Sequence, residues 1–282
     1  MDFIALIPAR YQSSRFPGKP LKKIDQHTVL WHTYHQILKS TFLDVKNTFI
    51  VTDDDRIQNE VLNWKVGAQI IRVDDYCVNG TERITLALEK DPLREKIGLN
   101  TLIVNVQGDE PLIDPGNIDF LLEKSLVNYP DFEIVTLYQN HNSNETSSEG
   151  SSEASSETIS KESDPNCCKL VTGMNNKVLY GSRSAIPFSK NSEPGPDKHH
   201  LKEHIGVFVY RREWLQTLLN SKDTPLQLTE DIEWLKTLEL DGKILAYPAP
   251  YQCYLGVNTP DDLIKIQSIL ASDYNVLTKS CD

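Results

Sequence analysis

Three cations lie close together in the first loop of the chain. The segment Ile7 to Leu21 (IPARYQSSRFPGKPL) follows a short apolar run and carries Arg10, Arg15 and Lys19. Its prolines and glycine exclude a continuous helix, so the segment reads as a loop at the end of a buried strand. Cations and backbone N–H groups at the carboxyl end of a sheet are what the phosphates of a nucleoside triphosphate require. The loop therefore predicts a phosphate site, and the competing interpretation is a solvated basic loop.

A carboxylate stands at the end of a second apolar run. Thr101 to Val106 is followed by Gln107-Gly108-Asp109-Glu110-Pro111, which places Asp109 at the tip of a loop that ends a strand. Mg²⁺ prefers one or two carboxylates together with phosphate oxygens. Asp109 facing a triphosphate is therefore a candidate magnesium ligand. The competing interpretation is a turn or cap residue.

A third polar segment is Asn79 to Arg83 (NGTER). Beside a phosphate loop, the side chains of Asn79 and Arg83 could read the edge of a nucleobase. Taken alone, the segment is equally typical of an ordinary N-cap with Thr81 starting a helix.

These three segments must be brought together by the elements that carry them. Short continuous apolar runs alternate with helical patterns, which predicts right-handed βαβ units and a mostly parallel sheet covered on both faces. The carboxyl ends of parallel strands meet at one edge, so the three loops should converge there. We expect a helix over Glu230 to Leu240, stopped by Gly242, and a terminal helix that begins at Pro260. The expected strands are Phe3–Leu6, Asn47–Val51, Ala68–Val73, Thr101–Val106, Glu133–Tyr138, Lys169–Thr172, Val178–Tyr180, Ile205–Tyr210 and Ile244–Tyr247.

One stretch interrupts this pattern. Residues 141–164 are rich in Ser and Glu, and their six acidic residues against Lys161 give a net charge of −5. Such a segment buries too little apolar area to offset the entropy of ordering it. We expect a single domain over residues 1–282 in which 141–164 is a disordered surface insertion; a phosphorylation or partner-binding segment is the alternative.

Composition excludes several classes of function. A net charge of −11 argues against a nucleic-acid or anionic-membrane binder. No apolar run approaches the roughly 20 residues that span a bilayer. The five cysteines lack metal-ligand or CxxC spacing and indicate a reducing compartment. We therefore expect a cytoplasmic protein with a small-molecule substrate.

With these motifs in hand, the chain resembles the 3-deoxy-D-manno-octulosonate cytidylyltransferases (CMP-Kdo synthetases). The matching segments occur in the same order over nearly the full length outside the Ser/Glu-rich stretch. They are Ile7–Leu21, VTDDDRI (Val51–Ile57), NGTERI (Asn79–Ile84), VNVQGDEPLI (Val104–Ile113), SRSAIPF (Ser182–Phe188), HIGVFVY (His204–Tyr210) and VNTPDDL (Val257–Leu263).

The resemblance implies a fold, a reaction and partners. The fold would be a three-layer α/β/α arrangement of the nucleotide-diphospho-sugar transferase type, with a small dimerisation extension. The reaction would transfer CMP from CTP to the anomeric hydroxyl of 3-deoxy-D-manno-octulosonate (Kdo), a 2-keto-3-deoxy sugar acid, and release pyrophosphate. Mg²⁺ would be the cofactor. The protein would be a homodimer joined around Ser182 to Phe188.

The resemblance also assigns roles to residues. It implies catalytic roles for Arg10, Lys19 and Asp109, a metal site at Asp109 and Asn258, and a sugar-acid side at Arg183 and His204. The nucleotide would lie among Pro8, Ala9, Arg10, Arg15, Lys19, Asn79, Gly80, Thr81, Arg83 and Gln107.

Four residues depart from the family's pattern. Asn258 stands where the family usually carries a second metal-binding Asp, and the loss of the Asp carboxylate charge should weaken a Mg²⁺ site. Lys236-Thr237 stands where a Glu-Gln pair is common on the sugar-binding helix, and Phe208 stands where relatives often have Tyr. Two alternatives therefore stay open: a synthetase for a nonulosonic acid such as a sialic acid, and a non-catalytic nucleotide-binding relative.

Overall fold

The computed structural model describes most of the 282 residues. The described ranges are 1–13, 16–74, 76–98, 100–141, 163–188, 201–253 and 256–279. Arg15, and residues 142–162 of the predicted insertion, lie outside the described residues.

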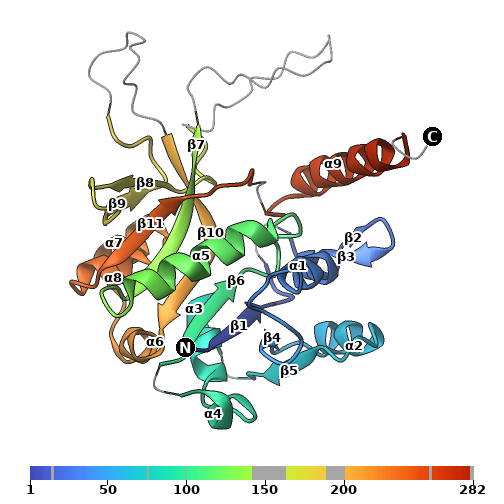
Figure 1. The fold of residues 1–282 in the computed structure, drawn as a ribbon, viewed down its shortest axis with the longest axis horizontal. Helices are drawn as coiled ribbons and strands as arrows, with labels where there is room; N and C mark the ends of the chain where they lie inside the picture. The colour runs from blue at the N-terminus through green and yellow to red at the C-terminus, as the bar shows by residue number, and fades with distance from the viewer. Residues whose placement is uncertain are drawn as a thin grey trace.

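A single mixed sheet organises the described part of the chain (Figure 1). Its main path has the strand order β11-β7-β10-β6-β1-β4-β5, and only β10 runs against the others. The predicted mostly parallel sheet is therefore confirmed, with one reversed strand near its middle. The bounds are β1 Phe3–Pro8, β4 Thr48–Thr52, β5 Gln69–Arg72, β6 Leu102–Val106, β7 Ile134–His141, β10 Leu201–Arg211 and β11 Ile244–Pro248.

Two hairpins lie off this path. β8 (Lys169–Thr172) pairs with β10 and with β9 (Val178–Ser182), so this hairpin extends the sheet beyond its main plane. β2 (Lys23–Ile24) and β3 (His27–Thr28) form a separate two-stranded sheet that follows the first loop.

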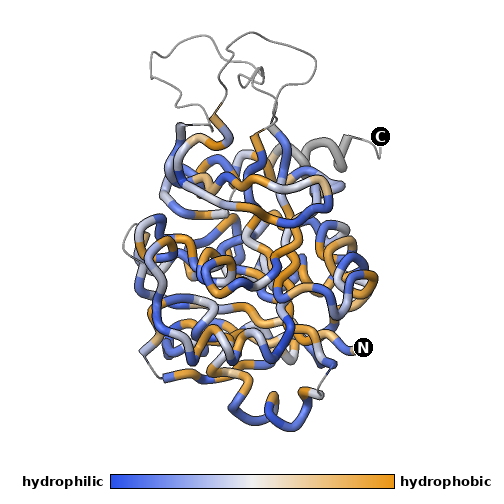
Figure 2. Tube along the Cα trace, turned by 90° about the vertical axis from the view of Figure 1, so that its left-hand side faces the viewer, coloured by the Kyte–Doolittle hydropathy of each residue, from blue (hydrophilic) through white to orange (hydrophobic). Residues whose placement is uncertain are grey.

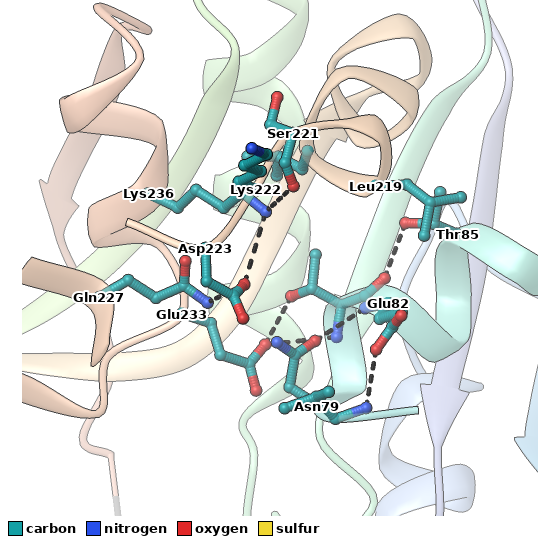
Figure 3. Close-up of a pocket in the computed structure, with 13 residues that line it drawn as sticks. Asn79, Glu82, Thr85, Leu219, Ser221, Lys222, Asp223, Gln227, Glu233 and Lys236 are labelled. Atoms are coloured by element: carbon teal, nitrogen blue, oxygen red, sulfur yellow. Dashed lines mark hydrogen bonds and ion pairs between the residues drawn. The ribbon is translucent and has the colours of Figure 1, made fainter. Parts of the chain in front are cut away.

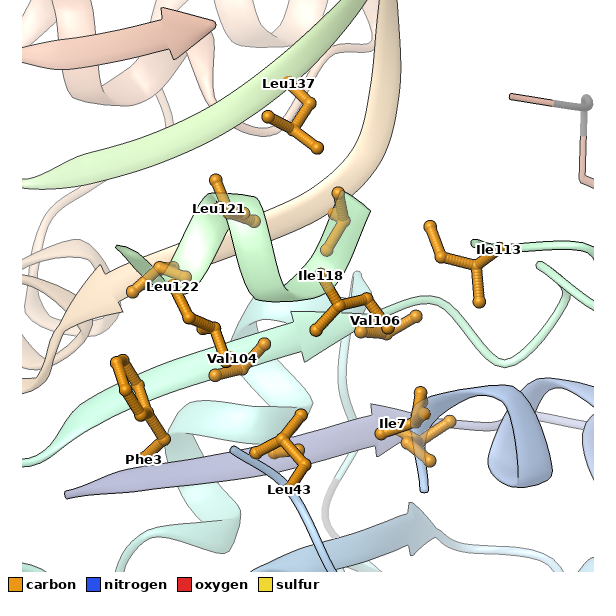
Figure 4. Close-up of a cluster of buried hydrophobic side chains, with 14 of the residues drawn as sticks. Phe3, Ile7, Leu43, Val104, Val106, Ile113, Ile118, Leu121, Leu122 and Leu137 are labelled. Atoms are coloured by element: carbon orange, nitrogen blue, oxygen red, sulfur yellow. The ribbon is translucent and has the colours of Figure 1, made fainter. Parts of the chain in front are cut away.

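Helices cover both faces of the sheet. Along β1, Phe3, Ala5 and Ile7 contribute to one buried cluster, while Ile4 and Leu6 contribute to the cluster on the opposite face. The first cluster packs against α1 (Val29–Ile37), α2 (Asp55–Asn63) and α5 (Pro115–Asn128). Figure 4 shows Ile118, Leu121 and Leu122 of α5 over Val104 and Val106 of β6. The second cluster packs against α3 (Gly80–Ala87), α4 (Leu93–Lys96), α6 (Arg212–Asn220) and α8 (Leu235–Glu239). Figure 2 shows the apolar residues gathered along these inner segments. Because side chains alternate across a strand, strands buried on both faces are mostly apolar, and the three-layer prediction is confirmed.

The helices begin and end near the expected signals, with one correction. The helix predicted over Glu230 to Leu240 is confirmed only in its second half: α7 ends at Glu230, Asp231 adopts φ 52°, and α8 begins at Leu235. A left-handed residue closes a helix, so the segment turns before it resumes. The bounds are η1 Lys19–Leu21, α1 Val29–Ile37, α2 Asp55–Asn63, α3 Gly80–Ala87, α4 Leu93–Lys96, α5 Pro115–Asn128, α6 Arg212–Asn220, α7 Pro225–Glu230, α8 Leu235–Glu239 and α9 Pro260–Lys279.

The position of β1 explains where a ligand can bind. β1 pairs with β4 on one side and with β6 on the other, both in parallel. The chain therefore leaves β1 and β6 in opposite directions, and such a switch point opens a crevice at the carboxyl ends of the strands.

Among the described residues, no helix has the length and apolarity needed to cross a membrane.

Candidate active site

The loops that follow β1 and β6 meet through an ion pair. The Lys19 ammonium donates a hydrogen bond to Oδ2 of Asp109, and its Nζ lies 3.5 Å from Oδ1 of Asn258. The Lys19 and Asp109 side chains are each 17% exposed, so the pair is shielded but open to a ligand. Three segments far apart in the sequence thus place a cation, a carboxylate and an amide oxygen at the switch point.

This group of side chains fits a divalent cation that phosphate helps to hold. The oxygens of Asp109 and Asn258 already converge on one positive charge. The described residues contain no cluster of three or more His, Cys, Asp or Glu that could bind a metal without help. Mg²⁺ suits such a site, because it takes one or two protein oxygens and completes its shell with phosphate and water.

Asn258 is held by the start of α9. Its backbone N–H donates to Oδ2 of Asp262 at 3.0 Å, and the Thr259 N–H donates to the same oxygen at 2.8 Å. The Asp262 N–H returns a bond to the Thr259 hydroxyl at 3.2 Å. This reciprocal cap fixes the loop backbone, so the Asn258 amide is presented from a rigid helix end.

The start of the first loop, from Pro8 to Arg10, lies at the same edge. The Ala9 N–H donates to the Val51 carbonyl at 2.9 Å, which continues the β1–β4 ladder past buried Pro8. Arg10 is exposed, and its Nη1 lies 3.4 Å from the Val78 carbonyl in the segment before α3. Arg10 thus extends from the first loop toward the third predicted segment.

The segment NGTER forms the start of α3 and lies against Gln107. Asn79 is the N-cap: its Oδ1 accepts from the Glu82 N–H at 2.8 Å, and α3 begins at Gly80, one residue before the expected start at Thr81. A Cβ added to Gly80 would lie 3.5 Å from Oε1 of Gln107 and 3.4 Å from the Pro8 ring. These are ordinary van der Waals distances, so the start of α3 lies close to Gln107 and Pro8 with room for a Cβ at Gly80.

Arg83 lies beneath this surface. It is 4% exposed, and its guanidinium donates to the Val73 carbonyl at 3.1 Å and to Asp53 at 2.8 Å. These bonds tie α3 to the ends of β4 and β5. The structure therefore engages Arg83 in the fold, and Asp53, which the sequence reasoning did not single out, is its partner.

Glu233 is a site residue that the sequence reasoning missed. Its carboxylate accepts from the Thr81 hydroxyl at 2.7 Å and lies 3.4 Å and 3.3 Å from the N–H groups of Gly80 and Thr81 (Figure 3). A carboxylate at a helix N-terminus is favoured by the free N–H groups and by the helix dipole. Glu233 lies in the turn between α7 and α8, where no periodic pattern marks it.

A polar cavity of about 270 Å³ opens beside Glu233, between the start of α3 and the end of α6. The Lys236 ammonium lies on its wall, donates to the Ser221 carbonyl at 2.8 Å and lies 3.7 Å from Asp223. Thr237 faces elsewhere, since its hydroxyl accepts from the Trp214 indole at 3.1 Å. Of the two positions that depart from the family's Glu-Gln pair, only Lys236 reaches this cavity.

The hydrogen bonds of His204 identify its tautomer. The Thr136 hydroxyl lies 2.7 Å from the Val207 carbonyl and 3.0 Å from Nε2 of His204. Because that hydroxyl donates its one proton to the carbonyl, Nε2 of His204 must donate to the hydroxyl oxygen, and Nδ1 keeps a free lone pair. Burial lowers the pKa of His204 to about 3. The ring is therefore neutral at physiological pH and can accept a hydrogen bond from a substrate hydroxyl.

Arg183 is bonded mainly to backbone. Its guanidinium donates to the carbonyls of Pro165, Glu230 and Asp231 at 2.9, 2.7 and 2.7 Å. The Glu230 carboxylate in turn accepts from the Arg183 N–H at 2.9 Å and from the Ser182 hydroxyl at 2.7 Å. Arg183 therefore joins three segments, and only part of its guanidinium is left for a ligand.

Glu110 forms part of the wall behind Asp109. A Cβ added to Gly206 or Gly256 would lie 3.3 Å or 2.8 Å from its Oε1, so the carboxyl fits where two glycines leave room. Burial, and then the neighbouring Asp109 charge, raise the pKa of Glu110, while the Lys19 ammonium opposes them. Gly206 lies in the register shift between β10 and β7, which brings that strand toward the site.

Comparison with known proteins gives a consistent result. A family model described as cytidylyltransferase matches residues 4–244. The chain is 35% identical over 267 residues to a mitochondrial 3-deoxy-manno-octulosonate cytidylyltransferase from Arabidopsis thaliana, covering 95% of this chain and 82% of that protein. It is 32% identical over 274 residues to an 8-amino-3,8-dideoxy-manno-octulosonate cytidylyltransferase from Shewanella baltica, covering 97% of this chain and 100% of that protein.

A solved structure has the same arrangement. The structure of a CMP:2-keto-3-deoxy-manno-octonic acid synthetase complexed with CTP matches with a TM-score of 0.80 at 26% identity. The match covers 97% of this chain and all of that one.

The protonation of His204 yields a stability test. The unfolded chain binds a proton at a histidine near pH 6.5, whereas folded His204 binds it only near its pKa of about 3. Protons therefore favour unfolding, and the free energy of unfolding falls as pH is lowered through 6.5, by at most ~1.4 kcal/mol per pH unit from this group. His204→Gln should flatten that slope in urea unfolding between pH 7.5 and pH 5. The exposed His27→Gln is the matched control; equal slopes in wild type and His204→Gln would contradict the assignment.

Proposed function

The chain belongs to the cytidylyltransferase family, and we propose that it transfers CMP from CTP to the anomeric hydroxyl of 3-deoxy-D-manno-octulosonate. The observation that carries this proposal is the meeting of Lys19, Asp109 and Asn258 at the switch point of the sheet. A cation and a metal-binding carboxylate at that crevice match the needs of a triphosphate donor. The CTP complex of the related synthetase supports the choice of nucleotide.

In the proposed reaction, the anomeric oxygen attacks the α-phosphorus of CTP and the bond from that phosphorus to the β-phosphate oxygen breaks. Pyrophosphate leaves, and the hydroxyl proton is lost. Arg10 and Lys19 would neutralise charge on the departing phosphates, since positioning and electrostatics dominate such transfers. Asp109 and Asn258 would hold Mg²⁺, which supplies further charge neutralisation at phosphate oxygens when bound. Pro8, Ala9, Asn79, Gly80, Thr81 and Gln107 would surround the nucleotide, with Arg83 supporting them from below.

The sugar acid would lie on the side of β10. The free lone pair of His204 suits a sugar hydroxyl, and the same neutral ring does not supply a cation for the acid's carboxylate. Some N–H donors of the Arg183 guanidinium are not used by its backbone contacts, and these would bind that carboxylate. The polar cavity beside Glu233 would receive the hydroxylated end of the acceptor.

The acceptor is tested with a panel of 2-keto-3-deoxy sugar acids and a coupled assay for pyrophosphate. We expect the highest kcat/KM with CTP and Kdo. The relative from Shewanella makes the 8-amino analogue the second candidate, which differs at the end that would lie in the cavity. A higher kcat/KM with the 8-amino sugar acid, or with a nonulosonic acid, would contradict the proposed acceptor. Binding of CTP without turnover on any acceptor would favour a non-catalytic relative.

Removing the cation or the carboxylate should abolish most of the turnover. Lys19→Ala and Asp109→Ala should each lower kcat about 10²–10³-fold, the usual loss for one preorganised charge contact. The circular dichroism spectrum and melting temperature should show that both variants fold. Lys23→Ala, which removes an exposed lysine four residues further along, should leave the rate unchanged. Wild-type turnover in either of the first two variants would reject the assignment.

Asn258 tests the metal site. Asn258→Asp restores a carboxylate opposite Asp109, so the variant should reach half its maximal rate at a lower Mg²⁺ concentration. Asn258→Ala, which removes the oxygen, should require more Mg²⁺ than wild type. Placement of Asn258 in the metal site fails if the Asp variant needs as much Mg²⁺ as the wild type, or more.

A homodimer would use the β8–β9 hairpin and the segment after it. Phe188 is 88% exposed and Leu179 on β9 is 59% exposed, so apolar surface is open to water there. Light scattering of the wild type should give the mass of a dimer, and Phe188→Glu should shift it toward the monomer. Tyr76→Glu, which changes an equally exposed aromatic outside this hairpin, should not. A monomeric wild type would contradict the proposal.

A further inference from the structure

The motif VTDDDRI has no place in the proposed chemistry, yet each of its acids has a defined partner. Asp53 pairs with Arg83 at 2.8 Å, and Asp55 pairs with Arg72 at 3.1 Å. Asp54 accepts from Nε and Nη2 of Arg56 at 2.9 Å and 2.6 Å, and also from the Arg56 backbone N–H at 2.9 Å. Asp53 and Asp55 therefore link neighbouring strands and helices, whereas Asp54 orients Arg56.

Arg56 contacts the first loop. Its guanidinium carbon is 3.2 Å from the centroid of the Tyr11 ring. The same ring also lies against Gly18, where an added Cβ would lie 2.9 Å from two ring carbons. The ring thus contacts both a guanidinium and a glycine that leaves room for it, and Gly18 itself has φ +69°, which favours glycine.

A backbone hydrogen bond between Tyr11 and Gly18 closes the loop. The Gly18 N–H donates to the Tyr11 carbonyl at 2.7 Å, so Tyr11 and Gly18 form its two ends. Arg10 precedes Tyr11 and Lys19 follows Gly18 in the chain. Each cation assigned to the phosphates is therefore joined by one peptide bond to a member of this stack.

We propose that Arg56, held by Asp54, is a positioning residue that clamps Tyr11 on Gly18 and thereby places Arg10 and Lys19 for the phosphates. The inference rests on the proposed function for its kinetic consequence, although the contacts themselves do not. A guanidinium over an aromatic face is attracted by the ring's negative potential, and its planar fork pairs with a carboxylate in one orientation. Small displacements of groups that position a reacting phosphate cost large factors in rate.

The test compares Arg56→Ala with variants that keep part of the stack. Arg56→Ala should lower kcat/KM for CTP roughly tenfold while the KM of the sugar acid stays unchanged. Tyr11→Phe keeps the ring and should retain most of the wild-type rate, whereas Tyr11→Leu should resemble Arg56→Ala. In the double variant Tyr11→Leu/Arg56→Ala, the two losses should not add, since both remove the same contact.

Arg72→Ala is the matched control. It also removes an arginine paired with an acid of the same motif, but Arg72 contacts Asp55 and Asp74 and no residue of the first loop is among those partners. Its kinetics toward CTP should match the wild type. A loss in Arg72→Ala equal to that in Arg56→Ala would overturn the proposal, because the effect would then reflect general loss of charge or stability.

Hydrogen exchange provides a readout that does not depend on turnover. The amides of Gly18 and Lys19 should exchange faster in Arg56→Ala than in the wild type and in Arg72→Ala, since the clamp protects that end of the loop. Unchanged exchange in Arg56→Ala overturns the proposal even if the rate falls. If the wild type shows no turnover with any acceptor, the proposed function fails, and faster exchange with weaker CTP binding in Arg56→Ala would still support the clamp.

Discussion

The ion pair between Lys19 and Asp109 joins residues 90 positions apart, and the rest of the site depends on it. It forms only because β1 and β6 are adjacent and parallel, so that their carboxyl ends release two loops into the same crevice. Asn258 reaches the same point from the start of α9. A sheet with another strand order would separate these three groups by the width of one or more strands.

The two halves of the site are built on different electrostatic plans. On the phosphate side, charges remain partly open: Arg10 is exposed, and the Lys19–Asp109 pair keeps contact with solvent. On the side of β10, the His204 ring is neutral and the Arg183 guanidinium is bonded mainly to backbone carbonyls. The proposed substrates would use both kinds of group, since phosphates need cations and sugar hydroxyls need oriented hydrogen-bond partners.

Most of the strands, and the loops that carry Lys19 and Asp109, were predictable, because continuous apolar runs and punctuating Gly and Pro are local signals. The contacts of the same residues were harder to predict from the sequence. The segment Asn79 to Arg83 suggested recognition of a nucleobase. The Arg83 guanidinium, however, donates hydrogen bonds to Asp53 and to the Val73 carbonyl, which only the folded chain brings near. Glu233 carries no periodic signal, and its meeting with Thr81 depends on the turn at Asp231 that divides the expected helix. Long-range pairing of polar groups is not encoded in windows of ten residues.

The reversed strand β10 also has a consequence for synthesis of the chain. β6 is complete by residue 106, but its second neighbour in the sheet is β10, at residues 201–211. On a ribosome, which releases the amino-terminal part first, β1, β4, β5 and β6 can pair while β6 still presents an open row of N–H and C=O groups. The nascent protein therefore exposes an apolar strand edge for about a hundred residues of elongation.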